Sequence, residues 1–205
     1  AMFLKPFFAD ANVSYEEADF VIYGVPFDGT SSFRAGARNA PAELRRASYN
    51  FETYIHDYKV DLAEVKICDL GDLEVSPDVN ETLELVKKWE ENIVRDGKIP
   101  VMLGGEHSLS YACVKCFKKT GVVVLDAHLD LRSEYLGIKF NHACVSNHIV
   151  KHSGKQNYVS IGIRSGTREE YNFADKNLRY YSAGKVASMG IEKVLRETLN
   201  YLKLK

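Results

Sequence analysis

The chain has 205 residues, of which 45% are hydrophobic and 27% charged, a composition typical of folded domains rather than of disordered chains. Its 27 Lys and Arg against 28 Asp and Glu give a net charge of -1, whereas proteins that bind nucleic acid or anionic membranes usually carry excess positive charge. No apolar run reaches membrane-spanning length. We therefore expect neither nucleic acid nor a membrane as a partner.

The length of the chain favours one domain that spans residues 1–205. Four cysteines are present, which are too few and too scattered to form a disulfide framework in a chain of this size. We therefore expect a reducing, cytoplasmic setting. The cysteines are Cys68, Cys113, Cys116 and Cys144.

Apolar runs alternate along the chain with segments of helical period, in which apolar residues recur every three or four positions. Strands that are apolar on both faces and separated by helices indicate a mostly parallel sheet covered on both sides, and thus an α/β fold. The predicted strands are 20–26, 65–70, 99–103, 122–125, 159–163 and 178–181. The predicted helices are 42–48, 76–97, 108–121 and 191–202.

Three ionisable residues directly follow the most apolar predicted strand, 122–125. In an extended chain, residues two apart point the same way, so Asp126, His128 and Asp130 are predicted to converge on one pocket. Imidazole and carboxylate ligands suit divalent metals such as Mn, Fe or Zn. The alternative is a surface loop whose polar side chains are simply solvated.

A second group of residues follows the strand 99–103. Gly104 and Gly105 allow close backbone turns, which would bring His107 over the edge of the sheet. Alone, this pattern also fits an ordinary turn in which Ser108 caps the next helix. Ligands bind outside the carboxyl ends of parallel strands, so the two groups together predict a metal site there.

These motifs resemble those of a known family, the ureohydrolases, which include the arginases and agmatinases. The two metal motifs of that family are similar to residues 104–108 and 126–130. Residues 24–31 and 34–38 resemble the agmatinase branch more than the arginases, and residues 161–165 extend the similarity. Glu106 stands where many members have Asp, which we interpret as a mild change because that position is not a ligand.

The resemblance implies a three-layer α/β/α sandwich with two metal ions, usually Mn²⁺, at the carboxyl edge of the sheet. It also implies that His107, Asp126 and Asp130 bind one metal ion, and that Asp126 bridges to a second ion held by His128. A metal-bridging hydroxide would then attack the guanidinium carbon of a small-molecule substrate, releasing urea and an amine. A homo-oligomer is expected.

Further roles follow from the same resemblance. His142 lies where the family has a histidine used in proton transfer or substrate binding, although it can equally be an ordinary loop histidine. Asp28 and Arg34 are expected to border the substrate entrance, although a glycine-rich loop needs such turn residues for its own structure.

The sequence departs from the family at one place. Further metal ligands of the family lie on a later strand of the form Ser-x-Asp-x-Asp-x-x-Asp-Pro, and nothing between Asp175 and Lys205 matches it. In the family, the strands that are missing here lie between the strand leading to His107 and the strand leading to Asp126. We therefore expect a fragment that lacks its C-terminal strands, or a fold that closes the gap by rearrangement or chain exchange.

Two classes of function remain open on this basis. The first is a metal-dependent hydrolase of linear guanidines, with agmatine as the expected substrate of the parent protein and with activity reduced by the missing ligands. Arginase, guanidinobutyrase and formimidoylglutamase activities stay open within that class. The second class is a noncatalytic scaffold that serves in assembly or binding.

Overall fold

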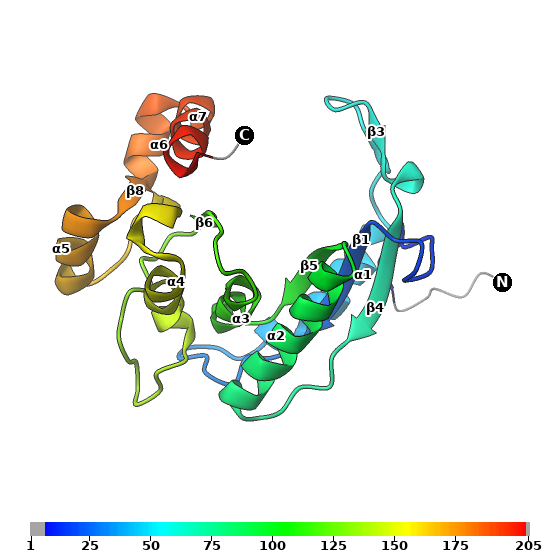
Figure 1. Cartoon of the computed structure of the whole chain (residues 1–205), viewed down its shortest axis with the longest axis horizontal. Helices are drawn as coiled ribbons and strands as arrows, with labels where there is room; N and C mark the ends of the chain where they lie inside the picture. Colours follow the sequence, from blue (N-terminus) through cyan, green and yellow to red (C-terminus); the bar gives the residue numbers. More distant parts are fainter. Residues whose placement is uncertain (1–6, 204–205) are drawn as a thin grey trace. The chain divides into compact units, whose positions relative to one another are not determined.

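The computed structural model describes residues 7–203, and the chain divides into two compact units, residues 1–109 and 110–205. Each unit contains a parallel three-stranded sheet with helices (Figure 1). The expected α/β class with parallel strands is confirmed. The expectation of one domain over the whole chain stays a prediction. Among the described residues, no helix combines the length and apolar character needed to cross a membrane.

The sheet of the first unit is built around a central apolar strand. β1 (Phe20–Val25) pairs in parallel with β4 (Ile67–Asp72) on one side and with β5 (Ile99–Gly104) on the other. Five of the six β1 residues are buried, as expected of a strand covered on both faces. All three strands run parallel, so their carboxyl ends share one edge of the sheet.

Two helices of the first unit contact β5, namely α1 (Ala40–Ser48) and α2 (Val79–Arg95). Asp78 caps α2 by accepting hydrogen bonds from the backbone N–H groups of Asn80 and Glu81. The predicted stripe of α2 is buried at Leu83, Val86 and Ile93. The short 3₁₀ helices of this unit are Ala37–Asn39, Leu62–Glu64 and His107–Leu109.

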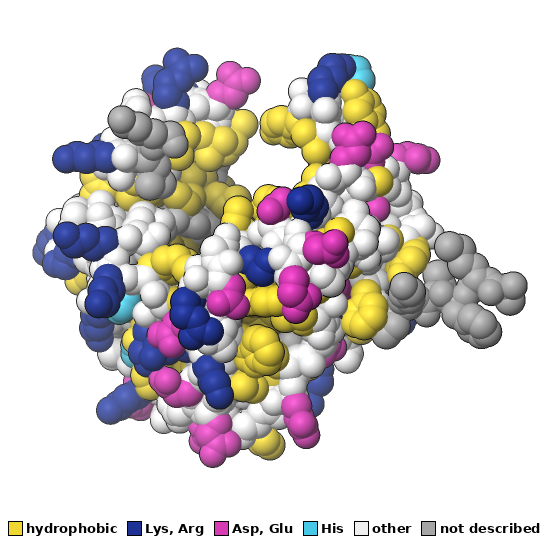
Figure 2. Space-filling model, turned by 45° about the vertical axis from the view of Figure 1, so that its right-hand side comes forward, with side chains coloured by type: hydrophobic (Ala, Val, Ile, Leu, Met, Phe, Trp, Pro, Cys, Tyr) yellow, Lys and Arg dark blue, Asp and Glu magenta, His cyan; other side chains and the backbone are white. Residues whose placement is uncertain are grey.

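A short antiparallel hairpin, β2 (Tyr54–Ile55) and β3 (Val60–Asp61), was not predicted from the sequence. Its apolar side chains are exposed, including Tyr58 at 79%, and Figure 2 shows hydrophobic side chains on it at the upper right. Each strand has only two residues, which is too short for the alternation of apolar and polar residues to stand out.

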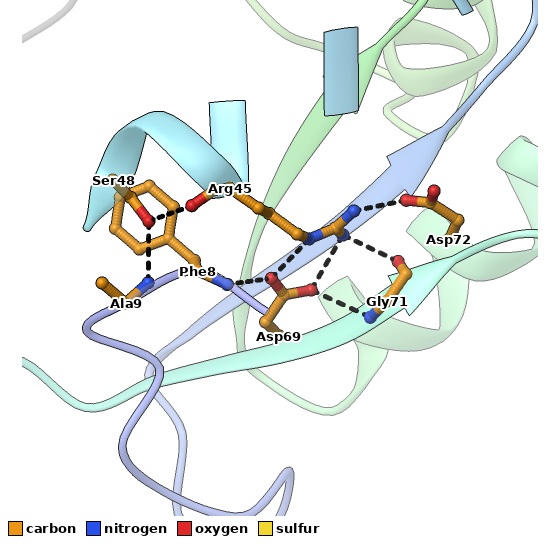
Figure 3. Close-up of polar contacts among 7 residues, drawn as sticks. All are labelled: Phe8, Ala9, Arg45, Ser48, Asp69, Gly71 and Asp72. Atoms are coloured by element: carbon orange, nitrogen blue, oxygen red, sulfur yellow. Dashed lines mark hydrogen bonds and ion pairs between the residues drawn. The ribbon is translucent and has the colours of Figure 1, made fainter. Parts of the chain in front are cut away.

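A buried arginine links three segments of the first unit (Figure 3). Arg45 of α1 donates hydrogen bonds to both carboxylate oxygens of Asp69, to Asp72 and to the carbonyl oxygen of Gly71. The backbone N–H of Phe8 also donates to Asp69, at 2.7 Å. Two carboxylates and one guanidinium therefore tie α1 and the N-terminal segment to the end of β4.

The second unit also contains three parallel strands and several helices. β7 (Tyr158–Ile163) lies between β6 (Val122–Leu125) and β8 (Arg179–Ser182). Val159 and Ile163 are fully buried, and Val194 of the last helix packs in the same cluster as Val159. The helices are α3 (Ser110–Lys115), α4 (Val145–Ser153), α5 (Arg168–Asn177), α6 (Ala183–Met189) and α7 (Ile191–Leu202), with 3₁₀ turns at His142–Cys144 and Lys155–Asn157.

The predicted helix from Ser108 to Gly121 is wrong in its extent. A 3₁₀ turn comes first, α3 begins at Ser110, and it ends at Lys115. The helices α4, α5 and α6 were not predicted. α5 begins with Thr167 and Glu170 in a reciprocal capping box, a signal that was present in the sequence.

Each sheet ends in an apolar strand. Among residues 7–203, β5 pairs only with β1, and β6 pairs only with β7. Ile99 of β5 is 53% exposed and Leu125 of β6 is 73% exposed. Within the described residues, these are the two strand edges that the resemblance to the ureohydrolases predicted to lack partners. Residues 204–205, at which the expected truncation falls, lie outside the described residues.

Candidate metal centre

The turn that carries His107 packs tightly against the segment after β1. A Cβ atom on Gly105 would lie 1.9 Å from the carbonyl oxygen of Phe27, so only glycine fits at this position. The N–H of Gly105 donates to Val25 O at 3.0 Å, and that of Glu106 donates to Phe27 O at 2.8 Å. The glycine therefore serves a close approach of two backbones, and His107 follows directly in the turn His107–Leu109.

Glu106 has a larger role than its sequence position suggested. Its carboxylate is buried and accepts hydrogen bonds from the backbone N–H of Thr30 at 2.8 Å and from the hydroxyls of Thr30 and Ser108. The side chain thus links the His107 turn to the loop after β1. From the sequence we interpreted the change from Asp to Glu as mild, because this position is not a metal ligand. Hydrogen bonds that a buried carboxylate accepts from distant backbone and hydroxyl groups leave no pattern in the sequence.

Asp28 organises the loop between β1 and α1. Its fully buried carboxylate accepts hydrogen bonds from the backbone N–H of Gly36 at 2.6 Å and from the guanidinium of Arg38. The hydrogen bond from Arg38, with further bonds from the backbone, lowers the pKa of Asp28 to about 2. The carboxylate is therefore charged at neutral pH and satisfied within its own loop.

Arg34 lies in the same loop with its side chain at the surface. Its guanidinium lies over the ring of Phe33, 5.2 Å from the ring centre. The Phe33 side chain is 88% exposed. The loop thus presents a cation and an aromatic ring to solvent, and the assignment of Asp28 and Arg34 to substrate binding stays a prediction.

In the second unit, Asp126 follows β6 directly. Its Oδ1 atom accepts a hydrogen bond from the backbone N–H of His128 at 2.7 Å and lies 3.2 Å from His128 Nδ1. The backbone N–H of Asp126 donates to Ile161 O of β7. Pairing with β7 therefore continues past the end of β6 and holds Asp126 at the carboxyl end of the sheet.

Asp130 comes close to Asp126, although by a different route from the one predicted. A carboxylate oxygen of Asp130 lies within 4.8 Å of one of Asp126. The chain is not extended between them, because it bends at Ala127 and Asp130 has the left-handed φ of 50°. That conformation costs roughly 1–2 kcal/mol for a residue other than glycine, and Asp tolerates it better than most.

The two carboxylates and the neighbouring imidazole form a set of donors that suits a divalent cation. Two like charges this close repel each other unless a proton or a cation lies between them. Oxygen and imidazole nitrogen ligands fit Mn²⁺ and related ions. Burial is the main cause, and the charge of Asp130 a smaller one, that raises the pKa of the Cys144 thiol to about 11.

His142 begins the 3₁₀ turn His142–Cys144, which Asn141 caps by accepting a hydrogen bond from Ala143 N. The His142 ring packs edge-on against Tyr135, with the ring centres 5.9 Å apart. Tyr135 precedes a tight two-residue turn, in which Leu136 and Gly137 both have positive φ. The histidine is half-buried, and its catalytic role stays a prediction.

Two residues that hold the Asp126–Asp130 segment were missed by sequence reasoning. Asn147 of α4 donates to the carbonyl oxygens of Asp130 and Leu131, and Glu170 of α5 accepts from the N–H of Leu131 at 2.8 Å. Only the Thr-x-x-Glu capping pattern that includes Glu170 was visible beforehand. His107 lies in the first unit, and its membership of one ligand set with Asp126, His128 and Asp130 stays a prediction.

Comparison with known proteins gives consistent matches. The chain is 42% identical over 167 residues to the agmatinase of Pyrococcus horikoshii, an alignment that covers 80% of this chain and 58% of that protein. It is 45% identical over 170 residues to the N(1)-aminopropylagmatine ureohydrolase of Thermococcus kodakarensis, with 79% and 57% covered. The chain therefore spans somewhat less than three fifths of these curated relatives.

Structural comparison agrees. The crystal structure of the agmatine ureohydrolase of Thermoplasma volcanium matches with a TM-score of 0.91 and 41% identity, over 96% of this chain and 68% of that one. This similarity confirms the expected arginase-like α/β fold. Residues 18–205 match the arginase family over most of the chain. The chain therefore belongs to the arginase family.

Proposed function

We propose that this chain carries the metal-binding part of an agmatinase-like ureohydrolase. Such an enzyme hydrolyses agmatine to urea and putrescine. The observation that carries the proposal is the pair of carboxylates, Asp126 and Asp130, within 4.8 Å of each other after β6. The names of the relatives at 42% and 41% identity support agmatine as the substrate.

The proposed ligands are His107, Asp126, His128 and Asp130, with Asp126 shared by two Mn²⁺ ions. Bound divalent ions would lower the pKa of water and so supply a nucleophile at neutral pH. The contact between Asp126 and His128 supports this assignment, because it holds the imidazole beside the shared carboxylate. None of the four proposed ligands is a thiolate, which favours Mn²⁺ over softer ions.

The other residues of the site would handle the substrate. His142 is proposed to transfer a proton to the leaving amine or to bind the guanidine. Arg34 is proposed to border the substrate entrance, and Asp28 to shape that border through its bonds to Gly36 and Arg38. A cytoplasmic setting and a homo-oligomer belong to the same proposal.

A second candidate substrate is N1-aminopropylagmatine. The relative named for that substrate is 45% identical to this chain. Both compounds carry the same guanidine group and differ in the length of the polyamine tail, so the same metal site serves either reaction. Comparing kcat/KM for the two compounds assigns the preferred substrate, and arginine tests whether a carboxylate is accepted.

Residues 1–205 are proposed to bind the two metal ions more weakly than a longer version, because the resemblance implies ligands beyond the four in this chain. The test compares this chain with a version that includes any coding sequence downstream of Lys205. We expect two Mn²⁺ per chain and urea release from the longer version, with less of both from residues 1–205. Equal metal content and activity in both would refute the proposed weakening.

The ligand assignment needs its own control. Asp126→Asn should abolish binding of Mn²⁺ and release of urea, because a shared ligand loses its charge. Asp57→Asn removes one negative charge at a side chain that is 94% exposed, and should leave both properties unchanged. Full metal binding by Asp126→Asn would refute the assignment of Asp126 as a ligand, whereas no metal in any version would favour a noncatalytic scaffold.

A further inference from the structure

The Asp130–Leu131 turn has an unfavourable backbone conformation that something must hold. Asp130 has a φ of 50°, a region that residues other than glycine seldom adopt. Such conformations persist where surrounding contacts determine them, and they concentrate at functional sites. The contacts of this turn therefore indicate which residues keep the Asp130 carboxylate in place.

One residue binds two successive carbonyl groups of this turn. The backbone N–H of Asn147 donates to Asp130 O at 3.2 Å, and the side-chain Nδ2 of Asn147 donates to Leu131 O at 2.9 Å. On the other side, the N–H of Leu131 donates to Glu170 Oε1 at 2.8 Å. Asn147 thus binds the carbonyl groups and Glu170 the amide group of the same short segment.

The position of Asn147 explains why an amide side chain is needed. Asn147 is the third residue of α4, and N–H groups in the first turn of a helix have no partner within the helix. Asp130 O supplies that partner. The second carbonyl, Leu131 O, accepts a hydrogen bond from the side-chain NH₂ group of Asn147. The side chains of an ionised Asp and of Ala have no such donor.

We propose that Asn147 is a positioning residue that holds the Asp130–Leu131 turn in its left-handed conformation and so keeps the Asp130 carboxylate beside that of Asp126. The effect on the turn is independent of the proposed function, whereas the effect on metal binding rests on it. Residues that orient metal ligands typically change metal affinity by about 10- to 100-fold when they are replaced.

The first experiment measures hydrogen exchange in the metal-free protein. Asn147→Ala removes the donor to Leu131 O, and we expect the amide of Leu131 to exchange roughly tenfold faster. Asn157→Ala is the matched control, because Asn157 Nδ2 makes the same kind of bond, to Ser153 O at 2.7 Å, in the same unit. Unchanged exchange of Leu131 in Asn147→Ala would overturn the proposal, as would an equal increase in Asn157→Ala.

The second experiment titrates Mn²⁺ by calorimetry, together with thermal unfolding of each variant. We expect Asn147→Ala and Asn147→Asp to lose about tenfold in Mn²⁺ affinity, as is common for residues that orient a ligand, whereas Asn157→Ala keeps the wild-type affinity. Equal losses in all three variants would show a merely structural role and overturn the proposal. If the unmodified chain binds no Mn²⁺, the proposed function fails, and the exchange experiment still decides the role of Asn147.

Discussion

Because of the buried Asp28 carboxylate, we expect the free energy of unfolding to decrease at acid pH. Its pKa falls from the ordinary 3.8 to about 2 in the folded chain, chiefly through the hydrogen bond from Arg38. Because this carboxyl has a lower pKa in the folded chain than in the unfolded chain, its ionisation stabilises the fold at pH values above the pKa of the unfolded state. This stabilisation is lost as the pH falls from about 4 to 2. Denaturant unfolding between pH 2 and 5 should show that loss in the wild type and a smaller one in Asp28→Asn.

Arg38→Gln provides the control for this titration. It leaves the carboxylate in place but removes its charged partner, so the transition should move toward the ordinary pKa of aspartate. Identical pH profiles for the wild type and Asp28→Asn would contradict the assignment of this acid sensitivity to Asp28.

Glu106 offers a second prediction for a single residue. Its carboxylate accepts three hydrogen bonds from Thr30 and Ser108, and Glu106→Ala would leave the buried N–H of Thr30 without this acceptor. An unsatisfied buried donor costs about 1–3 kcal/mol, so unfolding by denaturant should show a loss of that size. Thr30→Val, which keeps the N–H and loses only the hydroxyl, should cost about 1 kcal/mol.

At the scale of single residues, the sequence predicted that the side chains of Asp126 and Asp130 lie close together. It did not predict the backbone conformation that brings them together. Residue types after an apolar strand are visible in a sequence, and so is their metal chemistry. The left-handed φ of Asp130 is not, because it depends on Asn147 and Glu170, which lie 17 and 40 positions further along the chain. Contacts of this kind belong to the tertiary structure and leave no local pattern.

At the scale of elements, Arg45 joins α1, β4 and the segment at Phe8 through a buried ion pair. Arg45→Met would leave Asp69 buried without its charged partner, and we expect a loss of about 3–5 kcal/mol. The triple variant Arg45→Met, Asp69→Asn, Asp72→Asn removes the uncompensated charges and should recover part of that loss. Equal stability of the single variant and the wild type in denaturant unfolding would contradict this prediction.

The elements also differ in how well the sequence predicts them. β1, β6 and α7 were predicted because their apolar pattern continues over a whole strand or helix. α5 and α6 were missed: α5 has a mostly polar surface, and α6 has only seven residues, so packing rather than periodicity decides their conformation.

At the scale of the whole molecule, the order of the strands is the least predictable property. The two parallel sheets have the orders β4-β1-β5 and β6-β7-β8, so the second follows the order of the chain whereas the first places its earliest strand in the centre. Strand pairing depends on contacts between distant residues, which composition and periodicity do not report. Here the resemblance to the ureohydrolases, rather than the apolar pattern, predicted that β5 and β6 would lack a partner on one side.

The exposed edge of β6 predicts self-association of residues 1–205. An apolar edge strand with unpaired backbone groups is a template for pairing with another chain. Leu125 of β6 is 73% exposed, so Leu125→Lys should be tolerated by the fold while its charge opposes such pairing. Sedimentation at several concentrations should show association of the wild type and less of it for Leu125→Lys.

Leu136→Lys separates the effect of the edge from that of general surface hydrophobicity. Leu136 is 69% exposed, nearly as much as Leu125, but it lies in the turn between Tyr135 and Ile138 rather than on a strand edge. It should therefore leave the association of the chain unchanged. Equal suppression by both variants would assign the association to exposed apolar area in general, and a monomeric wild type at every concentration would show that the β6 edge is protected in solution.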